Sequence, residues 1–244
     1  MDNVEAAKKI IPLLDLTSLS ENDTEYSIAD FCHRAQTPYG NTAAVCIYNR
    51  FLTVAKQELK GSKIKLATVV NFPKGGHDLN KLRKEISSAI ESGADEIDAV
   101  FPYKDFLNKE YHYCSDFLQT ATTLCKDKTL KIILETGELK TAALIRKASE
   151  IVLENGADFI KTSTGKSKIS ATPQAANIML ETIKASAQPA GFKASGGIKT
   201  TTDAKQYLIL AESIMGPEWV TPDTFRIGAS ALLDDLLLTI NQGY

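Results

Sequence analysis

Lys161 and Lys193 each lie in a short, mostly apolar segment, residues 157–163 and 190–195, that is typical of a buried β-strand. Burying an ammonium group costs several kcal/mol unless the group is paired or loses its proton. On neighbouring strands one lysine places its charge beside the other amine, and in a dry site this lowers the pKa of that amine. A neutral buried amine can form a Schiff base with a carbonyl compound, so this pair predicts imine chemistry.

Each of these charged residues also has a purely structural explanation. A lysine near the end of a strand can extend past it and keep its ammonium group in water. Asp98, in the apolar run 96–101, could pair with a lysine for structural reasons alone. Near two amines the same carboxylate could also hold a water molecule and move protons. The two roles of Asp98 are compatible.

The elements that position these residues follow a repeating pattern. Apolar runs indicate eight strands, and roughly 20–35 residues separate one from the next, as in strand–helix repeats. Amphipathic patterns predict helices over 79–92 and 142–155, stopped by Gly93 and Gly156. We therefore expect the α/β class and a single (β/α)₈ TIM barrel over residues 1–244, without a linker. The expected strands are 10–16, 43–48, 65–72, 96–101, 130–135, 157–163, 190–195 and 225–229.

Barrel enzymes carry their chemistry at the carboxyl ends of the strands. The residues that should converge at this mouth are Asp15, Thr17, Cys46, Asn71, Asp98, Glu135, Lys161, Thr162, Ser163, Lys193, Ser195, Gly228 and Ser230.

Glycines in three of the predicted loops indicate an anion site. The loops after the strands of Lys161, Lys193 and Gly228 carry Thr164-Gly165-Lys166, Gly196-Gly197 and Gly228-Ala229-Ser230. Barrels often bind phosphate with the last loops and a helix N-terminus, where backbone N–H groups face the ligand. Glycine leaves room for that approach. Glycine pairs such as Gly196-Gly197 usually form only a turn. The position of these glycines in the loops after three successive strands is what supports an anion site.

Composition excludes several classes of protein. The net charge of −2 offers no basic field for nucleic acid, and no apolar stretch approaches the ~20 residues that span a bilayer. The first residues lack the pattern of a signal peptide. The three histidines show no metal-ligand spacing, and the four cysteines fit reduced thiols. We expect a cytoplasmic protein that uses neither a metal nor another cofactor.

Six segments resemble one family closely and in order along nearly the whole chain. They are LLDLTSL (13–19), NFPKG (71–75), GADEIDAVFPY (93–103), GADFIKTSTGK (156–166), GFKASGGIKT (191–200) and FRIGAS (225–230). Together they resemble the deoxyribose-phosphate aldolases. The resemblance implies a class I aldolase that cleaves 2-deoxy-D-ribose 5-phosphate to D-glyceraldehyde 3-phosphate and acetaldehyde, in the catabolism of deoxyribonucleotides.

The resemblance also implies roles for particular residues. Lys161 matches the Schiff-base lysine of the family, Lys193 the lysine that lowers its pKa, and Asp98 the proton-relay aspartate. A terminal tyrosine of some relatives matches Tyr244, which could assist proton exchange. A second serine of some relatives is replaced here by Ala231. The expected substrate and phosphate contacts are Asp15, Thr17, Cys46, Thr164, Gly165, Lys166, Gly196, Gly197, Gly228 and Ser230.

The residues alone leave other functions open. Another Schiff-base phosphosugar lyase or a transaldolase could use the same barrel and the same lysine. A catalytically dead barrel could act as a binding protein, although Lys161, Lys193 and Asp98 are all present. The partners that we expect are small phosphorylated sugars and aldehydes, with a homodimer as the assembly and no binding to nucleic acid or membranes.

Overall fold

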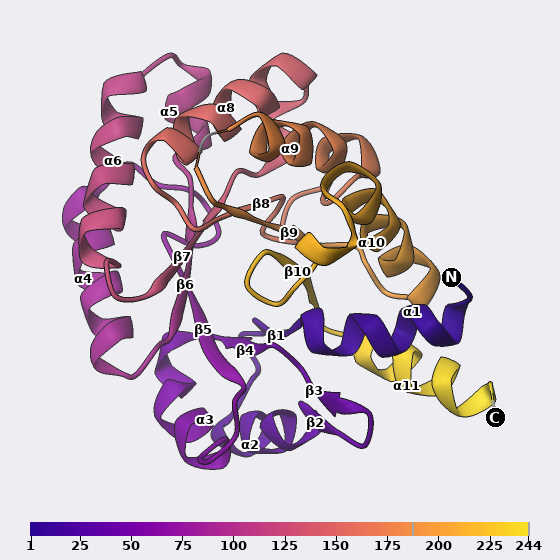
Figure 1. Ribbon diagram of the computed structural model, residues 1–244. Helices are drawn as coiled ribbons and strands as arrows, with labels where there is room; N and C mark the ends of the chain where they lie inside the picture. The colour runs from indigo at the N-terminus through magenta and orange to yellow at the C-terminus, as the bar shows by residue number, and fades with distance from the viewer. Residues whose placement is uncertain (187, 244) are drawn as a thin grey trace.

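Eight parallel strands close into a barrel in the computed structural model, which describes residues 1–186 and 188–243 (Figure 1). Each strand pairs with the next along the chain, and β1 closes the ring between β4 and β10. This confirms the predicted (β/α)₈ TIM barrel. The barrel strands are β1 (Leu14–Ser18), β4 (Ala44–Ile47), β5 (Lys65–Val70), β6 (Glu96–Val100), β7 (Thr129–Ile133), β8 (Phe159–Lys161), β9 (Gly191–Ser195) and β10 (Phe225–Ala229).

Helices connect the strands and form the outer layer (Figure 1). A short hairpin, β2 (Gln36–Thr37) and β3 (Gly40–Asn41), lies outside the ring. The α-helices are α1 (Asn3–Ile10), α2 (Glu25–Arg34), α3 (Leu52–Glu58), α4 (Leu79–Glu91), α5 (Tyr103–Leu107), α6 (Tyr111–Leu124), α7 (Thr136–Leu139), α8 (Ala142–Glu154), α9 (Pro173–Ala185), α10 (Thr201–Met215) and α11 (Leu232–Gln242). The 3₁₀ turns are η1 (Ile11–Leu13), η2 (Asn49–Phe51) and η3 (Pro217–Trp219).

Local signals explain where the helices begin and end. The side chains of Asp78 and Thr141 accept hydrogen bonds from backbone N–H groups in the first turns of α4 and α8. Gly93 and Gly156 follow the ends of these helices with φ of 98° and 80°, a conformation that glycine adopts without steric cost. The repeated motifs ESGAD and ENGAD therefore form the same kind of helix-to-strand loop, and both helices end within a residue of their predicted positions.

The first predicted strand needs a correction. Residues 10–16 were expected to be extended, but helix α1 ends at Ile10, η1 follows, and β1 begins only at Leu14. Pro12 suits the first turn of η1 because its fixed φ is close to the helical value. Ile10 is buried on α1, which packs against α10 and α11 (Figure 1). The other seven strands lie within two residues of their predicted ends.

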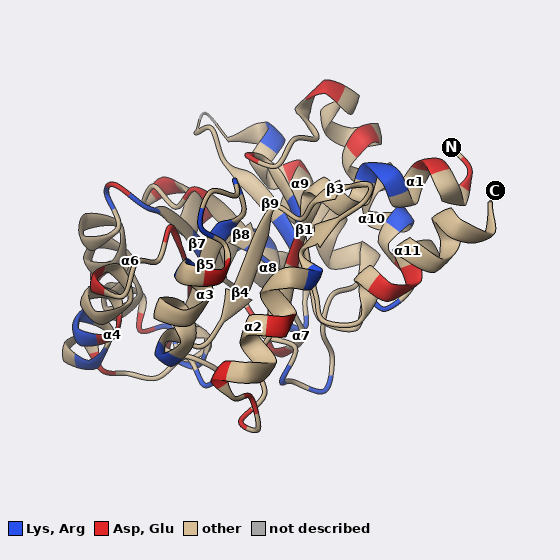
Figure 2. Cartoon of the chain, turned by 90° about the horizontal axis from the view of Figure 1, so that it is seen from below, with Lys and Arg blue, Asp and Glu red and all other residues tan. Residues whose placement is uncertain are grey.

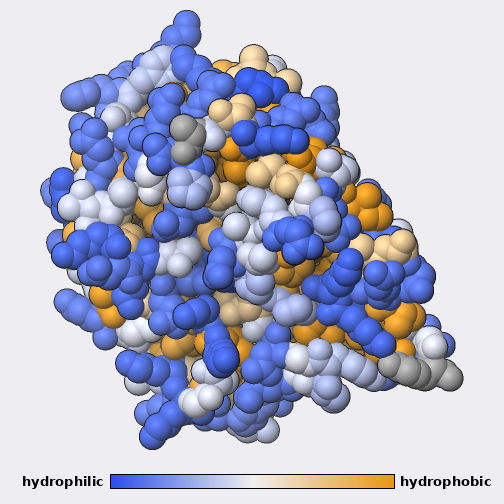
Figure 3. All heavy atoms as spheres, viewed as in Figure 1, coloured by the Kyte–Doolittle hydropathy of each residue, from blue (hydrophilic) through white to orange (hydrophobic). Residues whose placement is uncertain are grey.

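The outer surface is polar and of mixed charge. Figure 2 shows acidic and basic residues interspersed along the chain, in keeping with the net charge of −2. On the face seen in Figure 3, hydrophilic side chains cover most of the surface and apolar ones show between them. None of the helices in the described ranges combines the length and the apolar character needed to span a bilayer.

Candidate active site at the carboxyl end of the barrel

The pairing of β8 with β9 places Lys161 and Lys193 side by side, as register partners. Both side chains are buried, and both amines donate to the carboxylate of Asp98 on β6. The distance from Oδ2 of Asp98 is 2.7 Å to Nζ of Lys161 and 2.7 Å to Nζ of Lys193. The three residues singled out from the sequence therefore meet at one oxygen atom.

Six charged residues below Lys161 form a connected set that we call the buried charge network. Lys193 Nζ lies 2.5 Å from Asp15 Oδ2, and Lys131 Nζ lies 3.0 Å from Asp98 Oδ1. Lys131 also donates to Glu96. All six side chains are buried. The members of the network are Asp15, Glu96, Asp98, Lys131, Lys193 and Arg226.

The two central lysines are shifted in opposite directions. Burial lowers the pKa of Lys161 below its ordinary value; the Asp98 carboxylate opposes this shift and the Lys193 ammonium adds to it. Burial also acts to lower the pKa of Lys193, but the carboxylates of Asp15 and Asp98 outweigh it and raise this pKa above its ordinary value. Lys193 therefore stays cationic, and Lys161 is the amine that loses its proton more easily.

Asp98 is held as a carboxylate. Burial alone would raise its pKa, yet Lys131, Lys161 and Lys193 together hold the pKa of Asp98 well below the ordinary range. Such an ion is a weak base on its own. It can still orient amines and a water molecule, and it can pass on a proton when the neighbouring charges change during a reaction.

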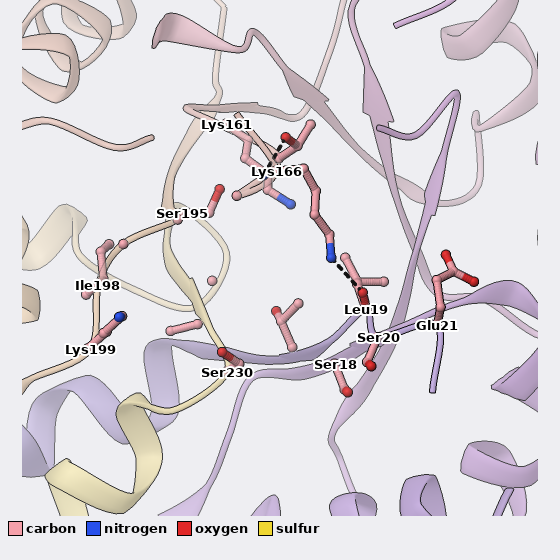
Figure 4. Close-up of a pocket in the computed structure, with 17 residues that line it drawn as sticks. Ser18, Leu19, Ser20, Glu21, Lys161, Lys166, Ser195, Ile198, Lys199 and Ser230 are labelled. Carbon is pink, nitrogen blue, oxygen red and sulfur yellow. Dashed lines mark hydrogen bonds between the residues drawn. The ribbon is translucent and has the colours of Figure 1, made fainter. Parts of the chain in front are cut away.

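A cavity of about 510 Å³ opens above Lys161 (Figure 4). Among its lining residues are nine of the fourteen residues predicted to be catalytic or to contact the substrate or its phosphate. They come from the ends of β1, β8, β9 and β10 and the loops that follow, so the residues predicted on this side of the mouth meet at one cavity. These nine residues are Thr17, Lys161, Thr164, Gly165, Lys166, Gly196, Gly197, Gly228 and Ser230.

Five of the residues predicted to be catalytic or to contact the substrate are not among the described residues that line this cavity. Asp15, Asp98 and Lys193 lie beneath it in the buried charge network. Cys46 is fully buried in a small apolar cluster of β4 and β5, where burial raises the pKa of its thiol. Tyr244 lies outside the described residues.

Two further residues expected at the mouth have local roles instead. The amide of Asn71 donates to the carbonyl of Val100 at 3.0 Å and to that of Gly76 at 3.2 Å, which holds its own loop together. Glu135 is buried and accepts a hydrogen bond of 2.5 Å from the hydroxyl of Thr164. Glu135 thereby fixes the start of the loop that carries Gly165 and Lys166.

The glycines of the predicted anion site are required by space and backbone shape. Gly196 has a φ of 88°, and a Cβ placed there would lie 2.6 Å from Cβ of Ser170. Gly197 has a φ of 81°, which other residues rarely adopt. After β10, helix α11 begins at Leu232 without a side-chain cap, so backbone N–H groups at its start remain for a ligand.

Lysines also reach this end of the cavity. Lys166 extends across the mouth, and its amine donates to the carbonyl of Leu19 at 2.9 Å (Figure 4). Lys199, which the sequence analysis did not select, lines the cavity next to Gly197 and Ile198. Phosphate-binding sites commonly combine such cations with free backbone N–H groups.

Sequence reasoning missed three members of the buried charge network: Glu96, Lys131 and Arg226. The alternation of side chains along a strand could have revealed them, because side chains two residues apart point to the same face of the sheet. Glu96 stands two residues before Asp98, and Arg226 stands two residues before Gly228. Lys131 is a charged residue in an apolar strand, as Lys161 and Lys193 are. In the described part of the chain, no group of three or more His, Cys, Asp or Glu side chains is arranged to hold a metal ion.

Comparison with known proteins gives a consistent family. The model of the "DeoC/LacD family aldolase" matches residues 9–236. Deoxyribose-phosphate aldolase of Agrobacterium fabrum (strain C58) is 50% identical over 241 residues, which cover 98% of this chain and 93% of the relative.

Solved structures support the same fold. An aldolase called QR15 superposes with a TM-score of 0.83 at 26% identity, over 96% of this chain and 97% of that one. Deoxyribose phosphate aldolase from Aeropyrum pernix, described as a tetramer, superposes with a TM-score of 0.75 at 24% identity, over 100% of this chain and 94% of that one. With a family model that matches most of its length and a relative at 50% identity, the chain belongs to the DeoC/LacD family of aldolases.

Proposed function

We propose that this aldolase cleaves 2-deoxy-D-ribose 5-phosphate to D-glyceraldehyde 3-phosphate and acetaldehyde through a Schiff base on Lys161. The observation that carries the proposal is the position of Lys161. It lines the cavity, while burial and the nearby Lys193 ammonium lower the pKa of its amine. An amine that loses its proton more easily than an ordinary lysine is thus presented to a carbonyl compound in the cavity.

The reaction begins when Nζ of Lys161 attacks the C1 aldehyde of the open-chain sugar. Loss of water gives an iminium ion. The bond between C2 and C3 then breaks; its electron pair becomes the C1=C2 double bond, and the C=N electron pair moves onto nitrogen, which gives an enamine. The proton of the C3 hydroxyl leaves to a water molecule held at Asp98, so C3 becomes the aldehyde of D-glyceraldehyde 3-phosphate. Protonation of the enamine at C2 and hydrolysis release acetaldehyde and restore Lys161.

The far end of the substrate is assigned to the loops after β8, β9 and β10. Gly165, Lys166, Gly196, Gly197 and Ser230 line that side of the cavity, and we assign them to the phosphate. Thr17 and Thr164 also line the cavity. Binding the phosphate there would position the scissile bond over Lys161, so that remote binding energy assists the chemical step. Ala231 stands where some relatives carry a second serine. We therefore assign one hydrogen bond to the phosphate to the backbone at the start of α11.

Other assignments rest on the sequence and the family. We propose that residues 1–244 act as one catalytic unit in the cytoplasm, in deoxyribonucleotide catabolism, and that the chain forms a homodimer. The proposed contribution of Tyr244 is proton exchange at the enamine carbon, and that of Asp15 and Cys46 is support of the substrate site from below. Each of these stays a prediction.

Reductive trapping tests the proposal directly. Borohydride added with acetaldehyde should attach a two-carbon group to Lys161, which peptide mapping would locate. Lys161→Met is the control and should remain unlabelled there. Lys166 and Lys168 follow β8 in a loop, and label on either of them with Lys161 unmodified would overturn the assignment. Trapping without cleavage of the phosphorylated sugar would instead favour another imine-forming lyase or a transaldolase. No trapping with any carbonyl compound would favour a binding protein.

A further inference from the structure

Arg226 and Glu96 form an ion pair deep in the barrel, below the residues that the proposed mechanism uses. Nη2 of Arg226 lies 2.9 Å from Oε1 of Glu96, and Nη1 lies 3.3 Å from Oε2. Nη1 also lies 2.5 Å from Oδ1 of Asp15. Both side chains are buried, and neither residue is among the described ones that line the cavity. They cannot touch a substrate there, so any effect on the reaction must pass through their neighbours.

Their neighbours lead to Lys161 by two routes. Glu96 accepts from Lys131, which lies 3.0 Å from Oδ1 of Asp98. Arg226 contacts Asp15, which lies 2.5 Å from Lys193, and Lys193 reaches Oδ2 of Asp98 at 2.7 Å. Both routes end at Asp98, whose Oδ2 is 2.7 Å from the amine of Lys161.

The buried charge network is electrically balanced without Lys161. It holds three carboxylates, Asp15, Glu96 and Asp98, and three cations, Lys131, Lys193 and Arg226. A protonated Lys161 would be a fourth cation with no carboxylate of its own, because it shares Oδ2 of Asp98 with Lys193. An uncompensated charge in a buried site is strongly unfavourable. The count therefore selects Lys161 as the group that gives up its proton.

We propose that Glu96 and Arg226 are positioning residues that set the protonation state of Lys161 through the charge balance of the buried network. The mechanism is electrostatic. Loss of the Glu96 charge leaves an excess of cations, which disfavours the ammonium form of Lys161. Loss of the Arg226 charge leaves an excess of carboxylates, which favours that form. The effect of this charge balance on the reaction rests on the proposed Schiff-base role of Lys161.

Other titratable groups around Lys161 do not supply this balance. Cys46 on β4 is kept as a neutral thiol by burial, which raises its pKa. On β5 the titratable residue is Lys65, which is exposed. Glu21, Lys166 and Lys199 line the cavity with Lys161, where water and salt weaken their influence. Glu135, after β7, is buried and held by Thr164, and burial raises the pKa of its carboxyl, which favours the neutral form. The charges that reach Lys161 through Asp98 are those of the network.

Competitive acylation measures the Lys161 amine without turnover. The whole protein is treated with trace acetic anhydride at a series of pH values, and the modification of Lys161 is followed by peptide mapping. In Glu96→Gln the midpoint of this curve should fall by about one pH unit, and in Arg226→Met it should rise by about one. The double variant carrying both changes removes one charge of each sign and should return close to the unaltered protein.

The double variant separates charge balance from packing. If the two residues only filled space, the double variant would differ most from the unaltered protein, and single changes would not shift the midpoint in opposite directions. Either result overturns the proposal. Should Arg226→Met fail to fold, Glu96→Gln decides alone: a lower midpoint supports the proposal, whereas an unchanged or higher one overturns it. Arg226→Lys keeps the charge and should leave the midpoint unchanged.

Failure of the proposed function would look different. Absence of borohydride trapping at Lys161 in the unaltered protein would remove the Schiff-base role and leave the acylation midpoints untouched. Normal trapping at Lys161 with equal midpoints in every variant would leave the function standing and overturn only the role of Glu96 and Arg226.

Discussion

Lys161 and Lys193 are register partners on adjacent strands, and their amines donate to the same oxygen, Oδ2 of Asp98, at 2.7 Å each. Their environments nevertheless differ. Lys193 has a second carboxylate, Asp15, at 2.5 Å, whereas Lys161 faces the cavity. The difference explains why the pKa of Lys193 is raised and that of Lys161 is lowered. Two identical side chains thus become a fixed cation and an amine that loses its proton more easily.

Replacing Lys193 should move the pH dependence of the reaction upward. Lys193→Leu removes a cation that lowers the pKa of Lys161, so this pKa should rise and activity at neutral pH should fall by orders of magnitude. Lys193→Arg is the control, since it keeps the charge and should retain more activity at neutral pH. Rate profiles measured from acidic to alkaline pH check this. A Lys193→Leu profile with its original position would show that Lys193 does not perturb Lys161.

Asp98→Asn should separate imine formation from proton transfer. Asp98 raises the pKa of Lys161, so its neutralisation should lower that pKa further and leave the amine able to react with acetaldehyde. Loss of the proton relay should lower kcat by about 10²–10⁴-fold, with KM for the sugar phosphate largely retained. Steady-state kinetics and borohydride trapping together check this. A change confined to KM would argue against a relay role, as would the loss of trapping in a folded variant.

Ser230→Asp tests the proposed phosphate site. Ser230 lines the cavity at the end of β10, just before α11, and an aspartate there would repel a bound phosphate. We expect kcat/KM for 2-deoxyribose 5-phosphate to fall about tenfold or more, while use of unphosphorylated deoxyribose changes little. Ser230→Ala is the matched control, which removes the hydroxyl without adding charge. Equal losses for both sugars would place the phosphate elsewhere.

Gly228→Ala should disturb the site by crowding. A Cβ at this position would lie 2.8 Å from Cε of Lys193 and 3.1 Å from Cβ of Ser195. Displacement of Lys193 should reduce kcat, and the crowding should cost about 1–3 kcal/mol of unfolding free energy. Gly76→Ala is a suitable control, because its added Cβ would meet only Oδ1 of Asn71, at an ordinary 3.5 Å. Urea unfolding and steady-state kinetics measure both effects, and an unaffected Gly228→Ala enzyme would contradict the packing argument.

The protein should lose stability in acid. The pKa values of Asp15 and Asp98 are lowered in the folded state, so both carboxylates stabilise it fully above their unfolded pKa of about 3.9. That contribution is lost as the pH falls from about 5 toward the lower folded pKa values. The measurement is urea unfolding at about pH 7, 5, 4 and 3, a series that spans this window. The unfolding free energy should fall steeply at the acidic end. Equal stability across the series would contradict these assignments.

The sequence by itself determined the repeating strand–helix order and the two lysines that stand out in apolar strands. Strand periodicity and helix stop signals act locally, so they can be read without knowing which strands become neighbours. Most of the residues that line the cavity from the loops after β8, β9 and β10 were also predicted, because the carboxyl ends of parallel strands share one edge, although Ile198 and Lys199 were not. The boundary of the first strand was not, since the packing of α1 on α10 and α11 decides it.

Only the tertiary structure decided which charges meet inside the barrel. Asp15 and Arg226 are separated by most of the chain, and the closure of β1 against β10 brings the first and last strands together. Alternation along the strands puts Glu96 on the face of Asp98 and Arg226 on the face of Gly228, but only the closed ring brings these residues and Lys131 together inside the barrel. The pKa of a buried group depends on every charge around it. The protonation of Lys161 is therefore a property of the assembled barrel, and it cannot be read from any single segment of the sequence.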